Sequence, residues 1–487
     1  MSFDALVVGG GISGLSTAHF LLRHLRAGCP GGGISPAVKV VEASGRSGGS
    51  IGTERVDGFL FEQGPNGVLD NAPDTLELIS SLGLDGKLLP ASPRSSDRYL
   101  MREGELEPLP RSPRAFLFSG VLSLRGRLGL LLEPFRSRGR AAADESIAEF
   151  GRRRLGQEAV DALLDPMVTG IYAGDVEALS MKSCFPRMAA LEEEYGSLVR
   201  GMMRRSKKKS SGEGKTSPFS ATLHSFEEGL GTLSGALAGE LGENIEYGLG
   251  AESISPCAEG WRVTFSDGRE ETARALVLAV PACRAASLFA GPQSDLGRDL
   301  ATISYSSVAV VCLGYRAEDV DSELDGYGFL APASEGLQTL GMIWTSSIFP
   351  GHAPEGHVSV RALAGGTRFP GVVAKPDEEL IEMIQRETGA AIGLKGKPVA
   401  QRVYRYEQAI PQYEVGHQAL LEGIEARLGA TPGLFLTGNS YRGVSVNDCL
   451  REGKRTAGEV FRYLEKAASA HSSSQPPPPP DTAEEKA

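Results

Sequence analysis

Cysteine and histidine are scarce in this chain of 487 residues, and their scarcity excludes several kinds of site. The six cysteines are scattered without a CxxC pair, a pattern that suits a reducing compartment better than a disulfide framework. The seven histidines share no common spacing, so we expect no protein-built metal site. Neither a disulfide scaffold nor a metalloprotein is predicted.

An excess of positive charge is also missing, because 50 basic residues face 61 acidic ones and leave a net charge of −11. No global field draws in phosphate backbones, so we expect no nucleic-acid partner. No secretory signal precedes the first apolar run at residues 5–8, and we therefore expect a cytoplasmic protein.

Long uninterrupted hydrophobic runs are absent too. The most apolar stretch, residues 116–132, is broken by Arg125 and Arg127, whereas a spanning helix needs about 20 mainly apolar residues. We do not expect this segment to cross a membrane. Its apolar residues and arginines suit peripheral contact with the inner face of the cell membrane, and they equally suit buried helices of a substrate domain.

Glycine, by contrast, is abundant: 62 residues, or about 13% of the chain, against a usual share of about 7%. The glycines follow no Gly-X-Y period and 41% of the residues are hydrophobic, which excludes a collagen-like or wholly disordered chain. At about 150 residues per domain, the length predicts roughly three domains. We expect many of the glycines at turns and close backbone approaches.

The first glycine cluster lies between a predicted strand at residues 5–8 and a predicted helix from residue 13 to about residue 26. It has the pattern Gly9-x-Gly11-x-x-Gly14, which allows a tight turn and lets the backbone approach a pyrophosphate at the helix N-terminus. A second predicted strand ends at Glu42, whose carboxylate can accept hydrogen bonds from a ribose. This order of elements predicts dinucleotide binding. The simpler alternative is a structural glycine turn beside a solvated glutamate.

Two further segments indicate which dinucleotide is bound. Residues 42–49 have the form E-x-x-x-R-x-G-G, and residues 436–444 have the sequence LTGNSYRGV. Both are similar to signatures of the flavin amine oxidase superfamily, in which they contact FAD. The resemblance implies FAD rather than NAD as the cofactor. It also implies a mixed α/β fold with a Rossmann-like FAD-binding domain.

Four more motifs narrow the resemblance. Residues 61–67, 170–175, 179–186 and 443–449 resemble those of the oxygen-dependent protoporphyrinogen oxidases, over a span from about residue 3 to residue 466. The resemblance implies oxidation of protoporphyrinogen IX to protoporphyrin IX in haem synthesis, with O2 as acceptor and H2O2 as by-product. Because a flavin accepts the hydride, we nominate no side-chain general base and no catalytic side chain. A homodimer is compatible with the sequence, which does not define the oligomeric state.

The resemblance also assigns roles to residues. On the cofactor side it implies contacts from Gly9, Gly10, Gly11, Ile12, Ser13, Gly14, Glu42, Ala43, Arg46, Gly48, Gly49, Gly64, Pro65, Asn66, Gly67, Ala251, Gly438, Val444, Ser445 and Val446. On the substrate side it implies that Arg98 pairs with a propionate, although an exposed, salt-bridged arginine is the alternative. The macrocycle pocket would be lined by Gly170, Gly328, Leu330 and Trp344.

The family fold implies three domains that interleave along the chain. The FAD-binding domain would comprise residues 1–85, 219–297 and 410–466, and a β-sheet substrate domain residues 86–110 and 298–409. A helical, membrane-contacting domain would comprise residues 111–205. We expect the basic and then Ser/Gly-rich stretch, residues 206–218, to form a solvated loop, and residues 467–487, with five consecutive prolines, to form a disordered tail.

Three rival functions stay open on the sequence alone. Coproporphyrinogen III oxidation uses the same flavin chemistry and would call for more basic side chains near the pocket. An amine oxidase or carotenoid desaturase would share the fold, but the motifs at 170–175 and 443–449 argue against it. The third is a flavin-binding scaffold without turnover.

Overall fold

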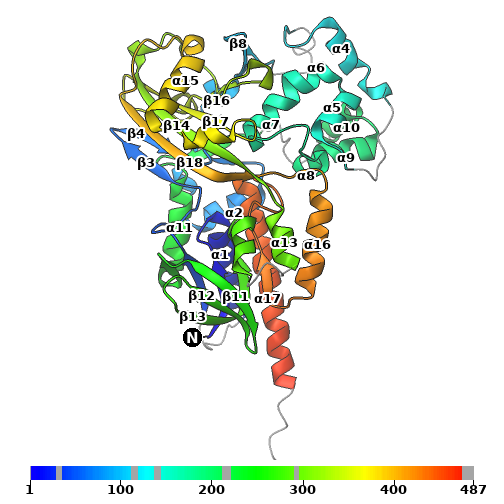
Figure 1. Cartoon of the computed structure of the whole chain (residues 1–487), viewed down its shortest axis with the longest axis vertical. Coiled ribbons are helices and arrows are strands. Elements are labelled where there is room, and N and C mark those ends of the chain that lie inside the picture. Colours follow the sequence, from blue (N-terminus) through cyan, green and yellow to red (C-terminus); the bar gives the residue numbers. More distant parts are fainter. Residues whose placement is uncertain are drawn as a thin grey trace, which may run out of the picture.

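Two β-sheets lie one above the other along the long axis of the molecule (Figure 1). They belong to a computed structural model that describes residues 2–28, 36–110, 119–136, 144–210, 221–289 and 295–473. The lower sheet contains parallel strands in the order β10-β2-β1-β13-β19. Their bounds are β1 Ser2–Val8, β2 Val38–Glu42, β10 Ile245–Tyr247, β13 Glu270–Leu278 and β19 Leu434–Leu436. β1 is apolar because it is covered on both faces, and Ala5, Leu6 and Val7 are fully buried.

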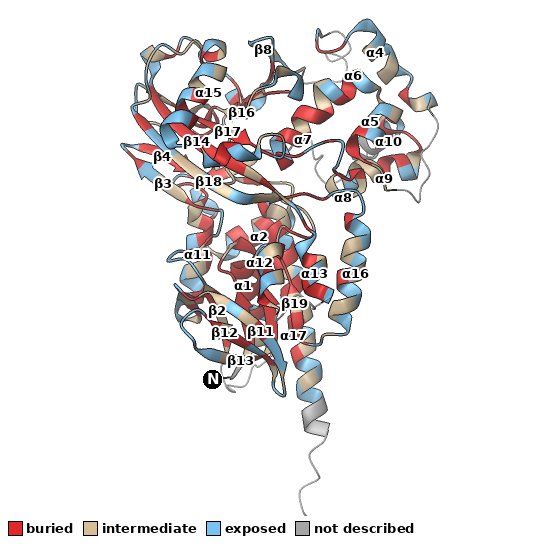
Figure 2. Ribbon diagram, viewed as in Figure 1, coloured by how far each residue is buried: buried red, intermediate tan, exposed pale blue. Residues whose placement is uncertain are grey.

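Helices cover both faces of the lower sheet (Figure 2). One face packs on α1 (Ile12–Gly28), α11 (Gly231–Leu241) and α17 (Val446–Ser473), and α2 (Pro73–Ser81) lies against α17. The other face packs on α12 (Ala282–Leu288), α13 (Asp295–Ala301) and α16 (His417–Gly429). Two further strands extend the sheet: β12 (Gly260–Phe265) runs antiparallel to β13, and β11 (Ala251–Cys257) runs antiparallel to β12. Gly453 lets α17 lie close to α1, since a Cβ there would come within 2.1 Å of Ser16 Oγ.

The upper sheet has seven strands in the order β18-β14-β17-β16-β15-β7-β8. Their bounds are β7 Arg98–Arg102, β8 Glu105–Pro108, β14 Tyr305–Arg316, β15 Gly328–Leu330, β16 Thr339–Ile343, β17 His357–Gly365 and β18 Ala400–Pro411. All neighbours are antiparallel except β15 and β7, which run parallel. Helix α15 (Asp377–Ile392) packs on one face of this sheet, with a large hydrophobic cluster between them.

Two small sheets connect the upper and lower parts. The first is the hairpin of β3 (Thr53–Val56) and β4 (Phe59–Glu62), whose phenylalanines pack against β14. The second has the order β5-β9-β6, with bounds β5 Val68–Leu69, β9 Leu223–Phe226 and β6 Leu88–Pro90. Short helical turns between these strands are Asp85–Lys87 and Pro93–Ser96. Both small sheets therefore lie next to the segments that join the two large sheets.

A helical region lies beside the upper sheet (Figure 1). Its elements are α4 (Leu124–Leu131), η3 (Glu133–Phe135), α5 (Ile147–Arg154), α6 (Gln157–Ala159), η4 (Val160–Leu164), α7 (Asp165–Tyr172), α8 (Met181–Cys184), α9 (Pro186–Tyr195) and α10 (Leu198–Ser210). A buried ion pair between Glu133 of η3 and Arg154 of α5 lies inside it, and both side chains are 0% exposed. Helix α7 connects this region with the upper sheet at β15 and β16.

The mixed α/β fold, the predicted strand at residues 5–8 and the predicted strand that ends at Glu42 are confirmed, but two boundaries were wrong. Helix α10 continues to Ser210, so residues 206–210 are not the expected loop. Lysine is a good helix former and favours the negative end of a helix. Helix α17 continues to Ser473, past the expected start of the tail at residue 467. Residues 98–102 and 105–108 form β7 and β8. Residues 211–218 and 474–487 lie outside the described residues.

Candidate active site

The carboxyl ends of β1, β2, β13 and β19 meet at the edge of the lower sheet that faces the upper sheet (Figure 1). Helices α1 and α17 both begin at this edge. The N-terminus of a helix carries unpaired N–H groups and a partial positive charge, and ligands of open parallel sheets bind at the carboxyl ends of the strands. This edge is therefore suited to a dinucleotide.

The three glycines of the first motif serve different purposes. Gly9 has a φ of +110°, and a Cβ there would lie 2.7 Å from the Ala279 carbonyl oxygen. A Cβ at Gly14 would lie 2.0 Å from the Gly9 carbonyl oxygen, so only glycine lets α1 start so close to β1. At Gly11, by contrast, the nearest atom is Gly49 Cα at 3.9 Å. The open space in front of Gly11 is a cradle that a pyrophosphate fits.

The Glu42 carboxylate is held beside this cradle. Its Oε2 accepts a hydrogen bond of 2.7 Å from the Gly10 N–H. Its Oε1 accepts bonds from the Ser44 N–H, at 2.8 Å, and from Ser44 Oγ, at 2.7 Å. The carboxylate is half-buried at the end of β2, where the ribose of a dinucleotide would lie.

Arg46 braces the glycine turn next to the cradle. Its guanidinium donates to the carbonyls of Gly49 and Ile51, both at 2.8 Å, and to Gln63 Oε1 at 3.0 Å. Within the turn, Gly48 and Gly49 have φ values of +103° and +61°, which favour glycine. The structure therefore gives Arg46 a positioning role, and the predicted contact with the diphosphate stays a prediction.

Ala43 and Ala251, both predicted cofactor residues, lie at the same end of the lower sheet. The Leu249 N–H donates to the Glu42 carbonyl at 3.0 Å, and the next segment of chain follows the same course. A Cβ at Gly250 would lie 3.5 Å from the Ala43 Cβ. The start of β11 therefore runs along the end of β2.

The loop formed by Gly64, Pro65, Asn66 and Gly67 is packed tightly between two other segments. A Cβ at Gly64 would lie 2.1 Å from the Ser50 carbonyl oxygen, and one at Gly67 would lie 2.3 Å from the His224 carbonyl oxygen. Neither position has room for a side chain. The loop therefore lies between the glycine turn and β9.

The C-terminal signature closes the site from the other side. Gly438 has a φ of +123°, and a Cβ added there would lie 3.9 Å from Ser13 Oγ at the start of α1. The segment Val444, Ser445 and Val446 leads into α17, and Ser445 Oγ accepts a bond from the Asp448 N–H at 3.1 Å. The structure thus brings every predicted cofactor segment to one edge.

Two buried charged side chains that were not predicted from the sequence, Arg361 and Glu62, lie near the 64–67 loop. Arg361 of β17 is only 5% exposed, and its guanidinium donates to Asn66 Oδ1 and to the Gly64 carbonyl. Glu62 is 2% exposed and accepts bonds from the Leu230 N–H, at 2.7 Å, and Thr53 Oγ1, at 2.8 Å. Burial raises the pKa of Glu62 to about 7, and these hydrogen bonds and Arg361 oppose the rise. A lone arginine in the apolar strand 357–365 is the signal that could have found this pair.

Arg98 and Arg361 stand in one row across the upper sheet. Arg98 of β7 is in register with Gly328 of β15, which is in register with Ile343 of β16, and Ile343 with Arg361. Three strand spacings put about 14 Å between the two arginine Cα atoms. Arg98 is exposed and its guanidinium lies 5.2 Å from the Tyr327 ring centroid. Within the described chain, no carboxylate forms an ion pair with Arg98.

Three predicted substrate residues lie together near this row. A Cβ at Gly170, at the end of α7, would lie 2.8 Å from Leu330 Cδ2, so these two residues are in contact. Gly328 has a φ of +136°, and its Cβ would lie 2.1 Å from the Met342 carbonyl oxygen. The backbone conformation therefore requires glycine at 328 whether or not a substrate is bound.

The structure does not bring Trp344 together with the other predicted substrate residues. Trp344 is 1% exposed and packs in the hydrophobic cluster under α15, with its ring 5.3 Å from that of Tyr99. Tyr99 and Arg98 are neighbours in β7 and therefore point to opposite faces of the sheet. The Trp344 ring therefore lies beside Tyr99, on the face of the sheet opposite to Arg98, and its role as a pocket wall stays a prediction.

The fold and the site define a dinucleotide-binding enzyme class with a separate β-sheet over the cofactor edge. Residues 12–461 match the family model described as flavin containing amine oxidoreductase. The chain is 33% identical to a chloroplastic protoporphyrinogen oxidase of Oryza sativa subsp. japonica, over 96% of this chain and 90% of that one. It is 29% identical to a coproporphyrinogen III oxidase of Bacillus subtilis (strain 168), over 94% and 98% of the two chains.

Solved structures agree with these sequence matches. A crystal structure from Exiguobacterium sp. 255-15 has a TM-score of 0.80 and 25% identity and covers 94% of this chain and 99% of its own. The chain therefore belongs to the flavin-containing amine oxidoreductase family, and its cofactor is FAD. The open cradle at Gly11, the carboxylate of Glu42 and the two helix N-termini fit the diphosphate and ribose of FAD.

Proposed function

We propose that the chain uses FAD and O2 to oxidise protoporphyrinogen IX to protoporphyrin IX in haem synthesis. The observation that carries this proposal is the row across the upper sheet, with the cofactor loop at Arg361 and the free guanidinium of Arg98 at the far end. Between them in the row lies Gly328, two residues before Leu330, which contacts Gly170 of α7. A guanidinium can hold a propionate bidentately.

The number of free cations favours the substrate with fewer carboxylates. Arg361 is engaged by the cofactor loop, and Arg368 is engaged by Asp165 and Thr169 of α7. Of these three described arginines, only Arg98 is free to bind a propionate. Coproporphyrinogen III, the substrate named for the Bacillus subtilis relative, has four carboxylates and is the rival.

The protein residues position the substrate and exclude water. FAD, when bound, supplies the two-electron redox chemistry. Three oxidations remove six hydrogens from the porphyrinogen, and three O2 molecules take them up as three H2O2. The Gly170–Leu330 contact and the Arg98 guanidinium would orient the macrocycle for each round.

The proposal is tested by supplying protoporphyrinogen IX and coproporphyrinogen III separately to the FAD-loaded protein under air. With both substrates, porphyrin fluorescence should increase faster than in the uncatalysed reaction, and it should increase faster with protoporphyrinogen IX than with coproporphyrinogen III. One H2O2 should form for every two electrons removed. A faster rise with coproporphyrinogen III would replace the proposed substrate. No rise with either would refute porphyrinogen oxidation, and the amine and desaturase substrates would be tried next.

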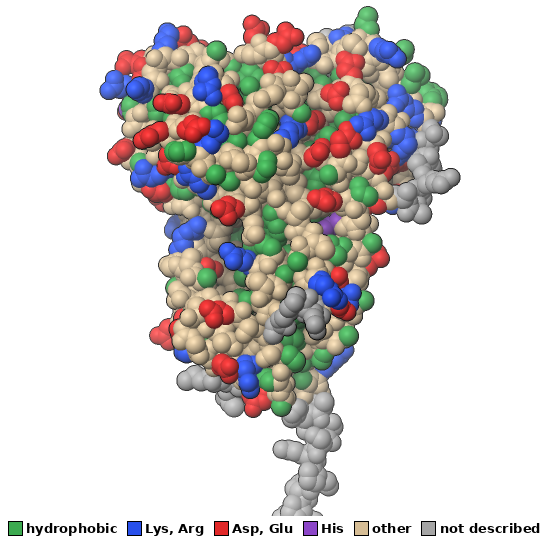
Figure 3. Space-filling view, in the orientation of Figure 1, with side chains coloured by type: hydrophobic (Ala, Val, Ile, Leu, Met, Phe, Trp, Pro, Cys, Tyr) green, Lys and Arg blue, Asp and Glu red, His purple; other side chains and the backbone are tan. Residues whose placement is uncertain are grey.

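We also propose that the helical region contacts a membrane surface peripherally. Five large hydrophobic side chains of α4 and η3 are exposed: Leu124, Leu128, Leu131, Leu132 and Phe135. Hydrophobic side chains gather at the upper right of the molecule, where Figure 1 places α4 (Figure 3). No helix within the described ranges is long and apolar enough to cross a bilayer. An apolar surface beside arginines suits an anionic bilayer surface and a poorly soluble substrate.

Cosedimentation with anionic lipid vesicles tests this contact. The variant Leu124→Ser/Phe135→Ser should bind several-fold less than the parent chain, because two of the most exposed apolar side chains are lost. Leu69→Ser, which removes an exposed leucine in β5, is the matched control and should bind like the parent. Equal binding by both variants would refute the proposed membrane face.

A further inference from the structure

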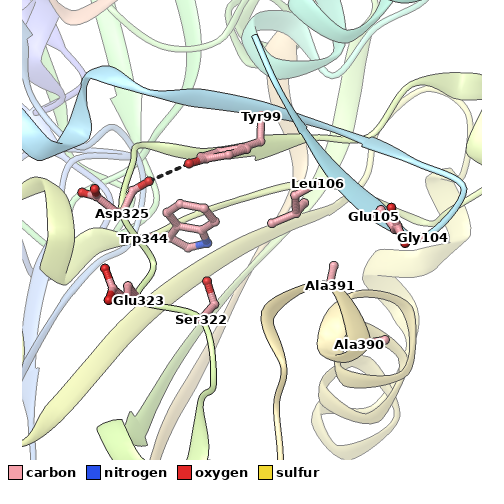
Figure 4. A pocket seen from close by; sticks show the side chains of 10 residues that line it. All are labelled: Tyr99, Gly104, Glu105, Leu106, Ser322, Glu323, Asp325, Trp344, Ala390 and Ala391. Atoms are coloured by element: carbon pink, nitrogen blue, oxygen red, sulfur yellow. Dashed lines mark hydrogen bonds between the residues drawn. The ribbon is translucent and has the colours of Figure 1, made fainter. Parts of the chain in front are cut away.

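A groove of about 510 Å³ opens on the upper sheet, between the β7–β8 hairpin, the segment before β15 and the end of α15 (Figure 4). Its polar and aromatic lining side chains include Tyr99, Glu105, Ser322, Glu323, Asp325 and Trp344. Because Tyr99 follows Arg98 in β7, the groove lies on the opposite face of the sheet from Arg98. It is therefore separate from the candidate active site.

The groove carries negative charge that the described chain does not balance. Glu105, Glu323 and Asp325 are exposed, and none of the three forms an ion pair with a described lysine or arginine. Two cations of neighbouring segments have other partners: Arg102 of β7 pairs with Glu107 at 2.9 Å, and Lys395 pairs with Asp321. The wall at Ala390 and Ala391 is the C-terminal end of α15, which adds a partial negative charge.

A buried donor faces the same groove. Trp344 is 1% exposed, and its Nε1–H has no acceptor within the described part of the chain. Its nitrogen points toward Ser322 in the groove (Figure 4). The other tryptophan, Trp261, is also buried, but its Nε1–H donates to the Pro432 carbonyl at 3.1 Å. Buried N–H groups are normally paired, so the Trp344 donor indicates an acceptor supplied by a ligand.

The ligand must combine a cation with a hydrogen-bond acceptor. A polyamine carries cations but no acceptor, whereas a peptide with lysine or arginine carries both. The edge of the sheet also suits a peptide, because β8 is the last strand of the upper sheet and its outer side pairs with no other described strand. Extended peptides bind such edges by adding a strand.

We propose that this groove binds an extended basic segment of a partner protein. One lysine or arginine side chain lies beside Glu323 and Asp325, and a second lies beside Glu105 at the other end of the groove (Figure 4). A backbone carbonyl between them accepts from Trp344 Nε1–H. The proposal does not depend on which porphyrinogen the enzyme oxidises. Porphyrinogen turnover by the variant Glu105→Gln/Glu323→Gln should equal that of the parent chain.

The test uses the FAD-loaded full chain and a fluorescein-labelled peptide amide of sequence GKGRGKG, followed by anisotropy at low salt. The variant Glu105→Gln/Glu323→Gln should weaken binding about tenfold, because both charges face the site. Glu382→Gln/Glu422→Gln, which removes two exposed charges of α15 and α16, should change it less than about twofold. Equal losses in the two double variants, or no binding by the parent chain, would overturn the proposal.

The indole provides an independent readout. In the Trp261→Phe background Trp344 is the only tryptophan, and its emission should shift to the red when the peptide carbonyl accepts its N–H. Trp344→Phe keeps a ring but loses the donor, and it should weaken the peptide several-fold while spermidine binding stays the same. Peptide binding without a change in Trp344 emission would contradict the proposed position of the peptide. If spermidine bound as tightly as the peptide, the ligand would be a small polyamine and not a partner protein.

Discussion

The cofactor edge and the helical region hold their parts together by different means. At the cofactor edge the contacts are made by backbone, as where the Gly14 Cα lies so close to the Gly9 carbonyl that no Cβ fits. In the helical region the contact at the centre is a fully buried ion pair, Glu133 with Arg154. Ser197 Oγ and the Leu198 N–H donate further hydrogen bonds to Glu133, at 2.6 and 3.0 Å.

This difference determines what each region tolerates. Close backbone packing requires glycine at a few positions that are near in sequence. A buried ion pair joins residues far apart in the chain, and each charge depends on its partner because burial removes it from water. Burial disfavours the ionised Glu133, but the hydrogen bonds from Ser197 and Arg154 outweigh burial and lower its pKa. We therefore expect substitutions at the cofactor edge to reduce cofactor binding. Substitutions at the buried ion pair of the helical region should instead lower the free energy of unfolding.

Gly14→Ala should have the largest effect, the loss of bound FAD. A Cβ at this position would lie 2.0 Å from the Gly9 carbonyl oxygen, so α1 has to move away from β1. The flavin absorbance of the purified protein measures the loss. Gly235→Ala in α11, where a Cβ would meet nothing within 4 Å, is the control and should keep its flavin. Full flavin content in Gly14→Ala would mean that the motif does not hold the cofactor.

Glu133→Gln should leave FAD bound and destabilise the helical region. It removes the fully buried carboxylate that pairs with Arg154 and leaves Glu192, whose Oε1 is 3.5 Å from Arg154 Nη1, as a more distant counter-charge. Breaking a buried ion pair costs about 3–5 kcal/mol in other proteins. Urea unfolding followed by far-UV circular dichroism measures the free energy of unfolding. Glu193→Gln, an exposed residue of α9, should be neutral. A loss of flavin without loss of stability would reverse the expected contrast between the regions.

The sequence was sufficient for the cofactor edge because its determinants are local. Glycines, strand and helix follow each other within residues 5–26, so their order alone places Gly9, Gly11 and Gly14. The same holds at the other end of the chain, where Gly438 precedes the start of α17.

The upper sheet and the helical region could not be derived in this way. Arg361 acts on Gly64 from nearly 300 positions away, and nothing in the sequence around either residue states that they meet. Trp344 was predicted at the pocket from a resemblance, whereas its ring packs on Tyr99, whose side chain points to the face of the sheet opposite to Arg98. These contacts depend on which strands are neighbours in the sheet. The order of the strands is a property of the whole fold and cannot be derived from the local sequence.

Glu62 lies where the cofactor loop meets the upper sheet, and it should make stability depend on pH. Its pKa is about 7 in the folded chain against 4.5 as the ordinary value, so between these pH values the folded chain keeps a proton that the unfolded chain has lost. The free energy of unfolding should therefore fall as pH rises from 4.5 to 7, by about 3 kcal/mol at about 1.4 kcal/mol per pH unit.

Glu62→Gln removes this dependence while keeping an acceptor for the Leu230 N–H. The difference in unfolding free energy between parent and variant should change across this window and be constant on either side. Glu382→Gln, at an exposed site on α15, should show no such step. A constant difference from pH 4 to pH 8 would show that Glu62 ionises normally.

Arg98→Ala should have the smallest effect, on substrate binding alone. Arg98 lies on β7 next to β15, where Leu330 contacts Gly170 of the helical region, so this is where that region meets the proposed pocket. Losing a charge-assisted hydrogen bond of about 1.5–3 kcal/mol should raise KM about tenfold or more and leave kcat nearly unchanged, as for a group that binds substrate and transition state equally. Arg98→Lys should recover part of the loss, and Arg94→Ala, an exposed neighbour, should match the parent. If KM is unchanged in Arg98→Ala, the propionate is bound elsewhere and the row from Arg98 to Arg361 does not define the substrate's orientation.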